Sequence, residues 1–224
     1  MENLTLTSKE LSLLVKFIFW STLAVFVSWV VLQLAYFDVD LTWQRLLSMA
    51  SSSLALISGV FFVFCKWGWK VSVLPSVLGR PVLGGVWIGE LASNYQASPG
   101  EPMPVVKMVF IVKQTYLTLS IQSFSAIQSG NSEVEAILSN PKTGSLRLTY
   151  IFELRSPYKG EVRLIKGVGD LSIVSKTVLM GGYWTNSPSN GELKMKRVSS
   201  TSKHLTGFAD VRTRWSNDRD WKVT

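Results

Sequence analysis

The chain has 224 residues, a formal net charge of +8 and 47% hydrophobic residues, a length that accommodates one domain of ordinary size together with a further segment. Its single cysteine, Cys65, excludes an intrachain disulfide, and with its single histidine, His204, it is too few for a tetrahedral metal site built from His and Cys alone. A Ser–His–Asp triad would depend on His204, which lies in a polar tail. We therefore expect no enzyme, no metal and no cofactor, with an enzyme built on a Ser–Lys or carboxylate site as the open alternative.

Two uncharged apolar segments lie in the first third of the chain, at Phe17–Phe37 and Leu46–Cys65. Each is long enough to cross a hydrocarbon core of about 30 Å as a helix, which takes about 20 residues. The joint between them, "DVDLTWQR", is short enough to require a helical hairpin. Residues 1–70 are thus predicted to be a transmembrane hairpin. The alternatives are a signal peptide for the first segment and two buried helices of a soluble core.

The flanks of these segments predict their orientation. Aromatic residues lie at both ends, as in the interfacial belts of membrane proteins. Basic residues flank the outer ends of the hairpin, whereas the joint carries only Arg45 against two aspartates. The residues concerned are Tyr36, Trp43, Trp67 and Trp69 for the belt, and Lys9, Lys16, Lys66, Lys70 and Arg80 for the charge. The positive-inside rule then puts both termini in the cytoplasm.

Small residues recur along one face of the second segment, at Ser48, Ser52, Ala55 and Gly59. Their spacing of four, three and four residues lets transmembrane helices approach closely. This face either packs against the first segment of the same chain or meets another chain.

After a linker at residues 71–82, the helical period gives way to short alternating runs, which are typical of β-strands. Turn residues separate them at "SPGEP", "SGNS", "NPKTG" and "SPSNG", whereas "GDLSIVS" is either a lid or an extension of the sixth strand. Over residues 83–198 we expect an antiparallel, up-and-down, lipocalin-like barrel of eight strands, with a two-sheet sandwich as the alternative. The expected strands are Leu83–Ser93, Val105–Gln114, Tyr116–Ser125, Glu133–Ser139, Ser145–Leu154, Val162–Val168, Thr177–Asn186 and Glu192–Val198.

Alternation along these strands assigns an inward face that is apolar with a few polar members. Polar side chains gathered near strand ends, with aromatic rings beside them, favour a ligand site: rings to stack on, Arg197 for an anion, and an amide and hydroxyls for base edges. The candidate ligand-binding residues are Trp87, Gln114, Ser125, Tyr150, Tyr183, Thr185 and Arg197. The alternative is that Arg197 lies at the barrel mouth, paired with a carboxylate or simply solvated, because a buried unpaired guanidinium is strongly unfavourable.

The soluble part is basic, with 19 Lys and Arg against 11 Asp and Glu over residues 70–224. This excess favours acidic partners, such as phosphate ligands or an anionic membrane leaflet. The polar, basic tail at residues 199–224 carries Phe208, Trp215 and Trp221, and folds either on the barrel or on the membrane.

Two transmembrane helices followed by a small β-barrel resemble the membrane effectors of bacterial cyclic-oligonucleotide-based anti-phage signalling (CBASS) systems. The motifs that carry the resemblance are the Gly-x-Trp start at Gly85 and Trp87, Gln114, Ser123 with Ser125, Tyr150 with Phe152, and "GGYWT" followed by "GELKMKR". The resemblance covers nearly the whole chain, and the architecture carries more of it than any one motif.

The resemblance implies a mechanism. A partner nucleotidyltransferase makes a cyclic dinucleotide, the cytoplasmic barrel binds it, and the protein forms a homo-oligomer that disrupts the bacterial inner membrane and kills the cell. It implies no DNA or RNA polymer as a partner. A membrane-tethered, lipocalin-like carrier of a small apolar ligand is the alternative.

Overall fold

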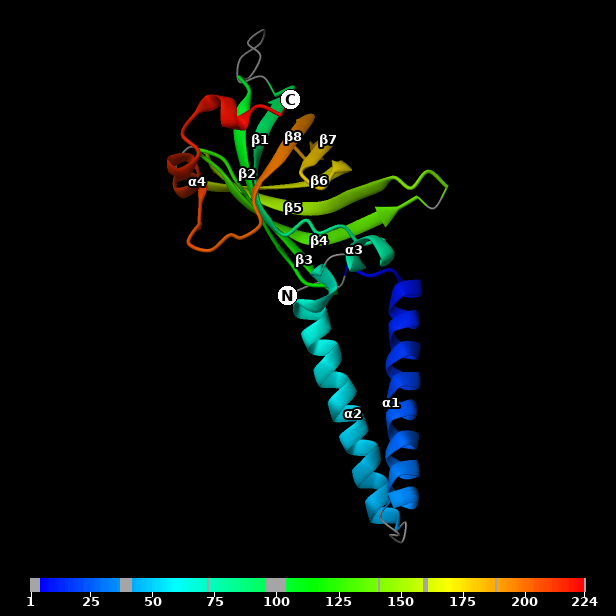
Figure 1. The fold of residues 1–224 in the computed structure, drawn as a ribbon. Helices are drawn as coiled ribbons and strands as arrows, with labels where there is room; N and C mark the ends of the chain where they lie inside the picture. Colours follow the sequence, from blue (N-terminus) through cyan, green and yellow to red (C-terminus); the bar gives the residue numbers. More distant parts are fainter. Residues whose placement is uncertain are drawn as a thin grey trace. The chain divides into compact units, whose positions relative to one another are not determined.

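A computed structural model describes residues 5–36, 42–71, 73–95, 104–140, 142–158, 161–187 and 189–223 (Figure 1). The chain divides into two compact units. One comprises Leu6–Leu74, and the other comprises Pro75–Thr224 together with the N-terminal stretch that ends at Thr5. Each unit is described by itself.

The helical unit contains two long helices, α1 (Ser8–Tyr36) and α2 (Trp43–Lys66), followed by the short helix η1 (Gly68–Lys70). Both long helices have the length and apolarity to cross a membrane, with mean hydropathies of 2.0 and 1.9. A core helix of a soluble protein would be mostly buried, but only 0% and 6% of their apolar windows are buried within the chain. This exposure counts against the soluble-core alternative. The helices begin earlier than the uncharged segments, at Ser8 and Trp43, because polar residues continue the helical turns.

The small-residue face of α2 is exposed. Ser48, Ser52, Ala55 and Gly59 all lie on the open side of the helix, and a β-carbon added at Gly59 would meet nothing within 4 Å. The buried positions of α2 are instead Met49, Ser53 and Cys65. The intrachain alternative for the small-residue face, that it packs against α1, is therefore not supported.

The second unit is a closed barrel of eight antiparallel strands, each paired with its neighbours in the sequence and β8 paired with β1 (Figure 1). The closure confirms the predicted up-and-down barrel and excludes the two-sheet sandwich. The strands are β1 (Gly85–Ser93), β2 (Val106–Gln114), β3 (Leu119–Phe124), β4 (Ser129–Ser139), β5 (Leu146–Tyr158), β6 (Glu161–Ser175), β7 (Val178–Thr185) and β8 (Asn190–Ser199). The short helix α3 (Leu74–Val77) precedes them within the expected linker.

Four strand boundaries differ from the sequence-based expectation by three residues or more, and one of them is the end of β5, at Tyr158 instead of Leu154. β3 begins only at Leu119, because Thr115 and Thr118 close a turn through their backbone and hydroxyl groups. β4 begins at Ser129, so "SGNS" is strand and not a gap, and a bulge between Ser132 and Val134 absorbs the irregularity. "GDLSIVS" is the end of the long β6, which settles the choice between lid and extension.

The barrel interior is the main core. It contains the inward rows assigned by alternation on β1, β2, β5 and β8, and adds residues from the remaining strands. Its fully buried side chains include Trp87, Leu148, Leu171, Leu179 and Met195. The packing of these rows positions the polar members that the sequence singled out.

A second core lies outside the barrel. The tail forms α4 (Phe208–Arg214) and η2 (Asp218–Trp221), and its Val211 and Trp221 are buried against the outer face of β1 and β2. The outward residues that they cover include Ile88 and Ile111. The tail therefore folds on the barrel.

Candidate functional site

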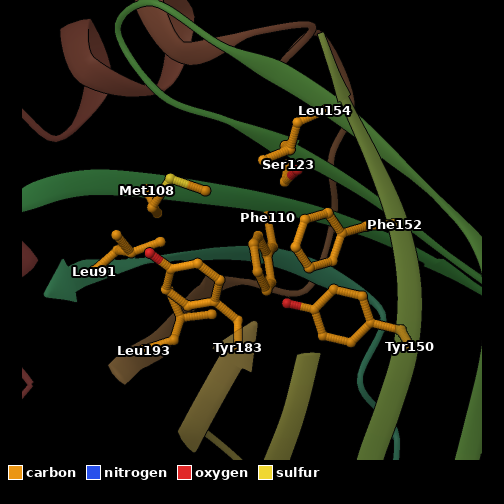
Figure 2. Close-up of a pocket in the computed structure, with 9 residues that line it drawn as sticks. All are labelled: Leu91, Met108, Phe110, Ser123, Tyr150, Phe152, Leu154, Tyr183 and Leu193. Atoms are coloured by element: carbon orange, nitrogen blue, oxygen red, sulfur yellow. The ribbon is translucent and has the colours of Figure 1, made fainter. Parts of the chain in front are cut away.

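The barrel interior contains a small cavity of about 40 Å³ (Figure 2). Figure 2 shows aromatic rings around it, with the ring of Tyr150 edge-on to Phe110 at 5.9 Å between centroids and tilted against Phe152 at 5.8 Å. The lining residues are Leu91, Met108, Phe110, Ser123, Tyr150, Phe152, Leu154, Tyr183 and Leu193. This volume accepts a few water molecules, whereas pockets for small-molecule ligands measure roughly 300–1,000 Å³.

Glycines beside the aromatic rings define how the cavity is filled. A β-carbon at Gly169 would collide with the ring of Tyr150, and one at Gly167 would collide with the ring of Phe152. Both glycines lie on β6, the strand next to β5, so each ring lies over the backbone of the glycine opposite it on β6. The rings thus occupy space that any other residue at the glycine positions would fill.

The two candidate tyrosines are on this lining. The Tyr183 hydroxyl donates to Ser93 Oγ at 2.8 Å. Burial raises the pKa of both Tyr150 and Tyr183, so at neutral pH both phenols keep their protons and can donate hydrogen bonds.

Glu135 is an inward polar residue that the sequence reasoning missed. Its carboxylate is 5% exposed and accepts a hydrogen bond from Ser132 Oγ, which in turn accepts from the backbone N–H of Ile121 at 2.8 Å. Desolvation by burial raises the pKa of Glu135, against a smaller lowering effect of the Ser132 hydrogen bond. In the strand register Glu135 lies opposite Tyr150, so the interior carries a carboxyl group beside a phenol.

Gln114 lies at the barrel end where the chain joins β1, which we call the tethered end. Its Oε1 accepts from the backbone N–H groups of Leu83 at 2.6 Å and Gly84 at 3.0 Å, and its Nε2 donates to the carbonyl of Pro81 at 3.0 Å. Three hydrogen bonds from one side chain thus hold the segment that leads into β1.

Arg197 and Trp87 bind the same segment. Arg197 donates to the carbonyl of Val82 at 3.1 Å and to that of Gly84, and the Trp87 indole N–H donates to the carbonyl of Leu83 at 2.8 Å. Burial lowers the pKa of Arg197. Two of its nitrogens, Nη1 and Nη2, are therefore bonded to backbone carbonyls, whereas the buried Nε has no hydrogen-bond partner among the described residues. Within the described part of the chain, neither the carboxylate partner nor the solvated position of the alternative interpretation is observed.

The other two candidates close hairpin turns at the opposite end of the barrel. Ser125 Oγ accepts from the backbone N–H of Gln128 at 3.1 Å, and Thr185 Oγ1 donates to the carbonyl of Ser187. The seven candidates therefore fall into three groups: Tyr150 with Tyr183 on the cavity, Trp87 with Gln114 and Arg197 at the tethered end, and Ser125 with Thr185 at the opposite turns.

Comparisons with known proteins give two curated relatives. The chain is 29% identical over 94 residues to a Staphylococcus schleiferi protein named CD-NTase-associated protein 15, a match that covers 42% of this chain and about half (51%) of that protein. It is 25% identical over 162 residues to a protein of the same name from Escherichia albertii, covering 67% and 77%. The chain resembles CD-NTase-associated protein 15. The resemblance expected from the sequence is thereby confirmed, and no protein-family model matches the chain.

Proposed function

We propose that this chain is a membrane effector of a CBASS anti-phage system. The observation that carries the proposal is the similarity to CD-NTase-associated protein 15 in two organisms, found in a chain with two apolar helices and a closed eight-stranded barrel. The name of these relatives associates them with a nucleotidyltransferase of the CD-NTase class. For this chain, the partner is a nucleotidyltransferase that supplies the signal, and the chain itself catalyses no reaction.

The ligand of the proposal is a cyclic dinucleotide bound within the barrel on the side of Tyr150 and Tyr183. A cavity of about 40 Å³ is too small for it, so the rings of Tyr150 and Phe152 leave Gly169 and Gly167 and stack on the bases. Two protonated phenols and the buried Glu135 then face the base edges as donors and acceptor. Gln114 and Arg197 do not contact the ligand in this proposal and act by holding the segment that leads into β1, a strand of the barrel wall.

The output of the proposal is assembly in the inner membrane, followed by loss of membrane integrity and cell death. The exposed small-residue face of α2 supports assembly, because Gly59 and its neighbours would let helices of different chains approach closely. The basic flanks of the helices support an orientation with both termini and the barrel in the cytoplasm.

A cellular experiment tests this function. The full chain is expressed with the nucleotidyltransferase of its own system, wild type or catalytically inactive, and entry of a membrane-impermeant dye is followed after phage infection. We expect dye entry only with the active enzyme and the intact chain. Dye entry that is equal with the inactive enzyme, or absent with the active one while the chain is present in the membrane, would contradict the proposal.

One observation favours a second candidate, a tethered carrier of an apolar ligand. The cavity lining is mostly apolar, with Leu91, Met108, Leu154 and Leu193 among its members. Mass spectrometry of small molecules released from the purified full chain separates the two functions, because a carrier would release a lipid-like compound and the effector would not.

A further inference from the structure

Charge is distributed unevenly between the two ends of the barrel. In an antiparallel barrel the tethered end comprises the start of β1, the end of β8, and the β2–β3, β4–β5 and β6–β7 turns with the strand ends that they join. Four lysines lie there, at Lys113, Lys142, Lys176 and Lys196. Arg147, the second residue of β5, also lies at this end and is paired with Asp170 of β6, whereas none of the four lysines forms a salt bridge among the described residues.

The rest of the barrel surface differs from this end. Toward the opposite end the described basic residues are interspersed with acidic ones and partly paired with them: Lys166 pairs with Glu133 at 3.1 Å, and Lys107 pairs with Asp218. At the tethered end, by contrast, four lysines have no acidic partner among the described residues. Unpaired positive charge is therefore more concentrated at the tethered end.

Exposed apolar side chains accompany the lysines at this end. Leu138 precedes the β4–β5 turn that holds Lys142 and is 45% exposed, and Val174 precedes the β6–β7 turn that holds Lys176 and is 62% exposed. Surfaces that lie on a bilayer combine apolar side chains, which enter the interface, with basic ones, which face the headgroups.

The chain connections also leave from this end. Thr5 is bonded to the β2–β3 turn, because its backbone N–H donates to the carbonyl of Leu117 at 2.9 Å and its hydroxyl accepts from Arg80. Two residues, Leu6 and Thr7, lie between Thr5 and Ser8, the first residue of α1. The segment from α2 returns to the barrel at β1, also at this end.

We propose that the tethered end of the barrel is a docking surface for anionic phospholipid headgroups of the membrane that the two apolar helices cross. The lysines supply the attraction, and Leu138 and Val174 enter the interface. Docking fixes one end of the barrel on the bilayer and leaves the opposite end facing the cytoplasm. The proposal needs no nucleotide, so its failure is distinguishable from failure of the proposed function.

Quenching by spin-labelled lipid headgroups tests the proposal. A fluorophore is attached at Thr177→Cys, in the β6–β7 turn, in a Cys65→Ser background of the full chain. The chain is placed in nanodiscs of zwitterionic phosphatidylcholine, or of phosphatidylcholine with about one-third phosphatidylglycerol. We expect stronger quenching in the anionic discs, and its loss at about 1 M salt, where the screening length falls to about 3 Å.

Two matched double variants locate the surface. Lys142→Gln with Lys176→Gln removes two tethered-end charges, and Lys194→Gln with Lys222→Gln removes two exposed charges elsewhere. A basic residue near an anionic surface contributes roughly a factor of five, so the first pair should lower the ratio of docked to undocked barrel by roughly 25-fold. The control pair should leave it nearly unchanged. Equal quenching in both kinds of disc, or equal effects of the two pairs, would overturn the proposal.

Discussion

Replacing Gln114 by alanine should destabilise the barrel before it affects any ligand. The side chain is 7% exposed and serves three backbone groups, two of which are the N–H groups of Leu83 and Gly84. A buried donor left without its acceptor costs about 1–3 kcal/mol. Water entering the vacated space offsets part of this, so we expect a loss of about 2–4 kcal/mol, which is a large fraction of the 5–15 kcal/mol typical of a domain.

The assay is thermal and urea unfolding of the full chain in a mild detergent, followed by the near-ultraviolet circular dichroism of its tryptophans. Trp87 is fully buried and bonded to Leu83, so it reports on the segment that Gln114 holds. Gln122→Ala, on the outward face of β3, is the matched control and should change stability by less than about 0.5 kcal/mol. If Gln114→Ala melted like the wild type and lost nucleotide affinity, our structural assignment of Gln114 would be refuted.

Three further predictions concern the interior and the helices. Because burial raises the pKa of Glu135, the folded chain holds this proton more tightly than the unfolded chain, so stability should fall as pH rises from the ordinary glutamate pKa through the raised one. In urea unfolding between about pH 4 and about pH 8, Glu135→Gln should flatten this part of the stability profile, and an unchanged profile would contradict the prediction. Gly169→Ala should destabilise the barrel by about 1–3 kcal/mol, because the added β-carbon would collide with the Tyr150 ring. Gly182→Ala should cost less, because its β-carbon would lie 3.4 Å from a backbone carbonyl oxygen, and equal melting temperatures of the two variants would show that the Tyr150 ring moves freely. Gly59→Leu should insert and bind nucleotide normally but lose ligand-dependent crosslinking in membranes, and crosslinking at the wild-type level would exclude this face from assembly.

Alternation predicted most of the barrel because one face of each strand is buried. On β2, for example, Met108, Phe110 and Val112 are buried in the barrel interior, as alternation predicts. Val109 and Ile111 on the outer face are also buried, because the C-terminal tail covers them. The apolar helices were equally predictable, since an uncharged run of about 20 residues has few other structures available.

On β4 the same rule would mislead. Alternation would predict that the apolar residues Val134, Ala136 and Leu138 face inward. In the structure Val134 and Leu138 are exposed and Glu135 is buried. The bulge between Ser132 and Val134 adds one residue and reverses the faces beyond it. A bulge leaves little trace in a single sequence, so Glu135 could not be found as an inward residue.

The partners of the inward polar residues were also beyond sequence reasoning. Alternation placed Gln114 and Arg197 inside, which the structure bears out in part, because Gln114 is buried and Arg197 is half-buried. The groups that bond to them are backbone amides and carbonyls of residues 81–84, which lie 30 to 115 positions away in the chain. Backbone groups carry no sequence signature. Inward polar residues that hold a backbone segment and inward polar residues that bind a ligand therefore have the same sequence pattern.

Direct titration of the purified full chain with cyclic dinucleotides tests the central claim. Calorimetry in detergent with a panel of these compounds, and with the matching linear dinucleotides as controls, measures binding without any cellular partner. We predict that at least one cyclic compound binds with micromolar or tighter affinity, that Tyr150→Ala or Tyr183→Ala weakens it, and that the linear forms bind much more weakly. If no cyclic dinucleotide binds to a chain whose tryptophan signal shows a folded barrel, the chain is not a receptor for this class of ligand.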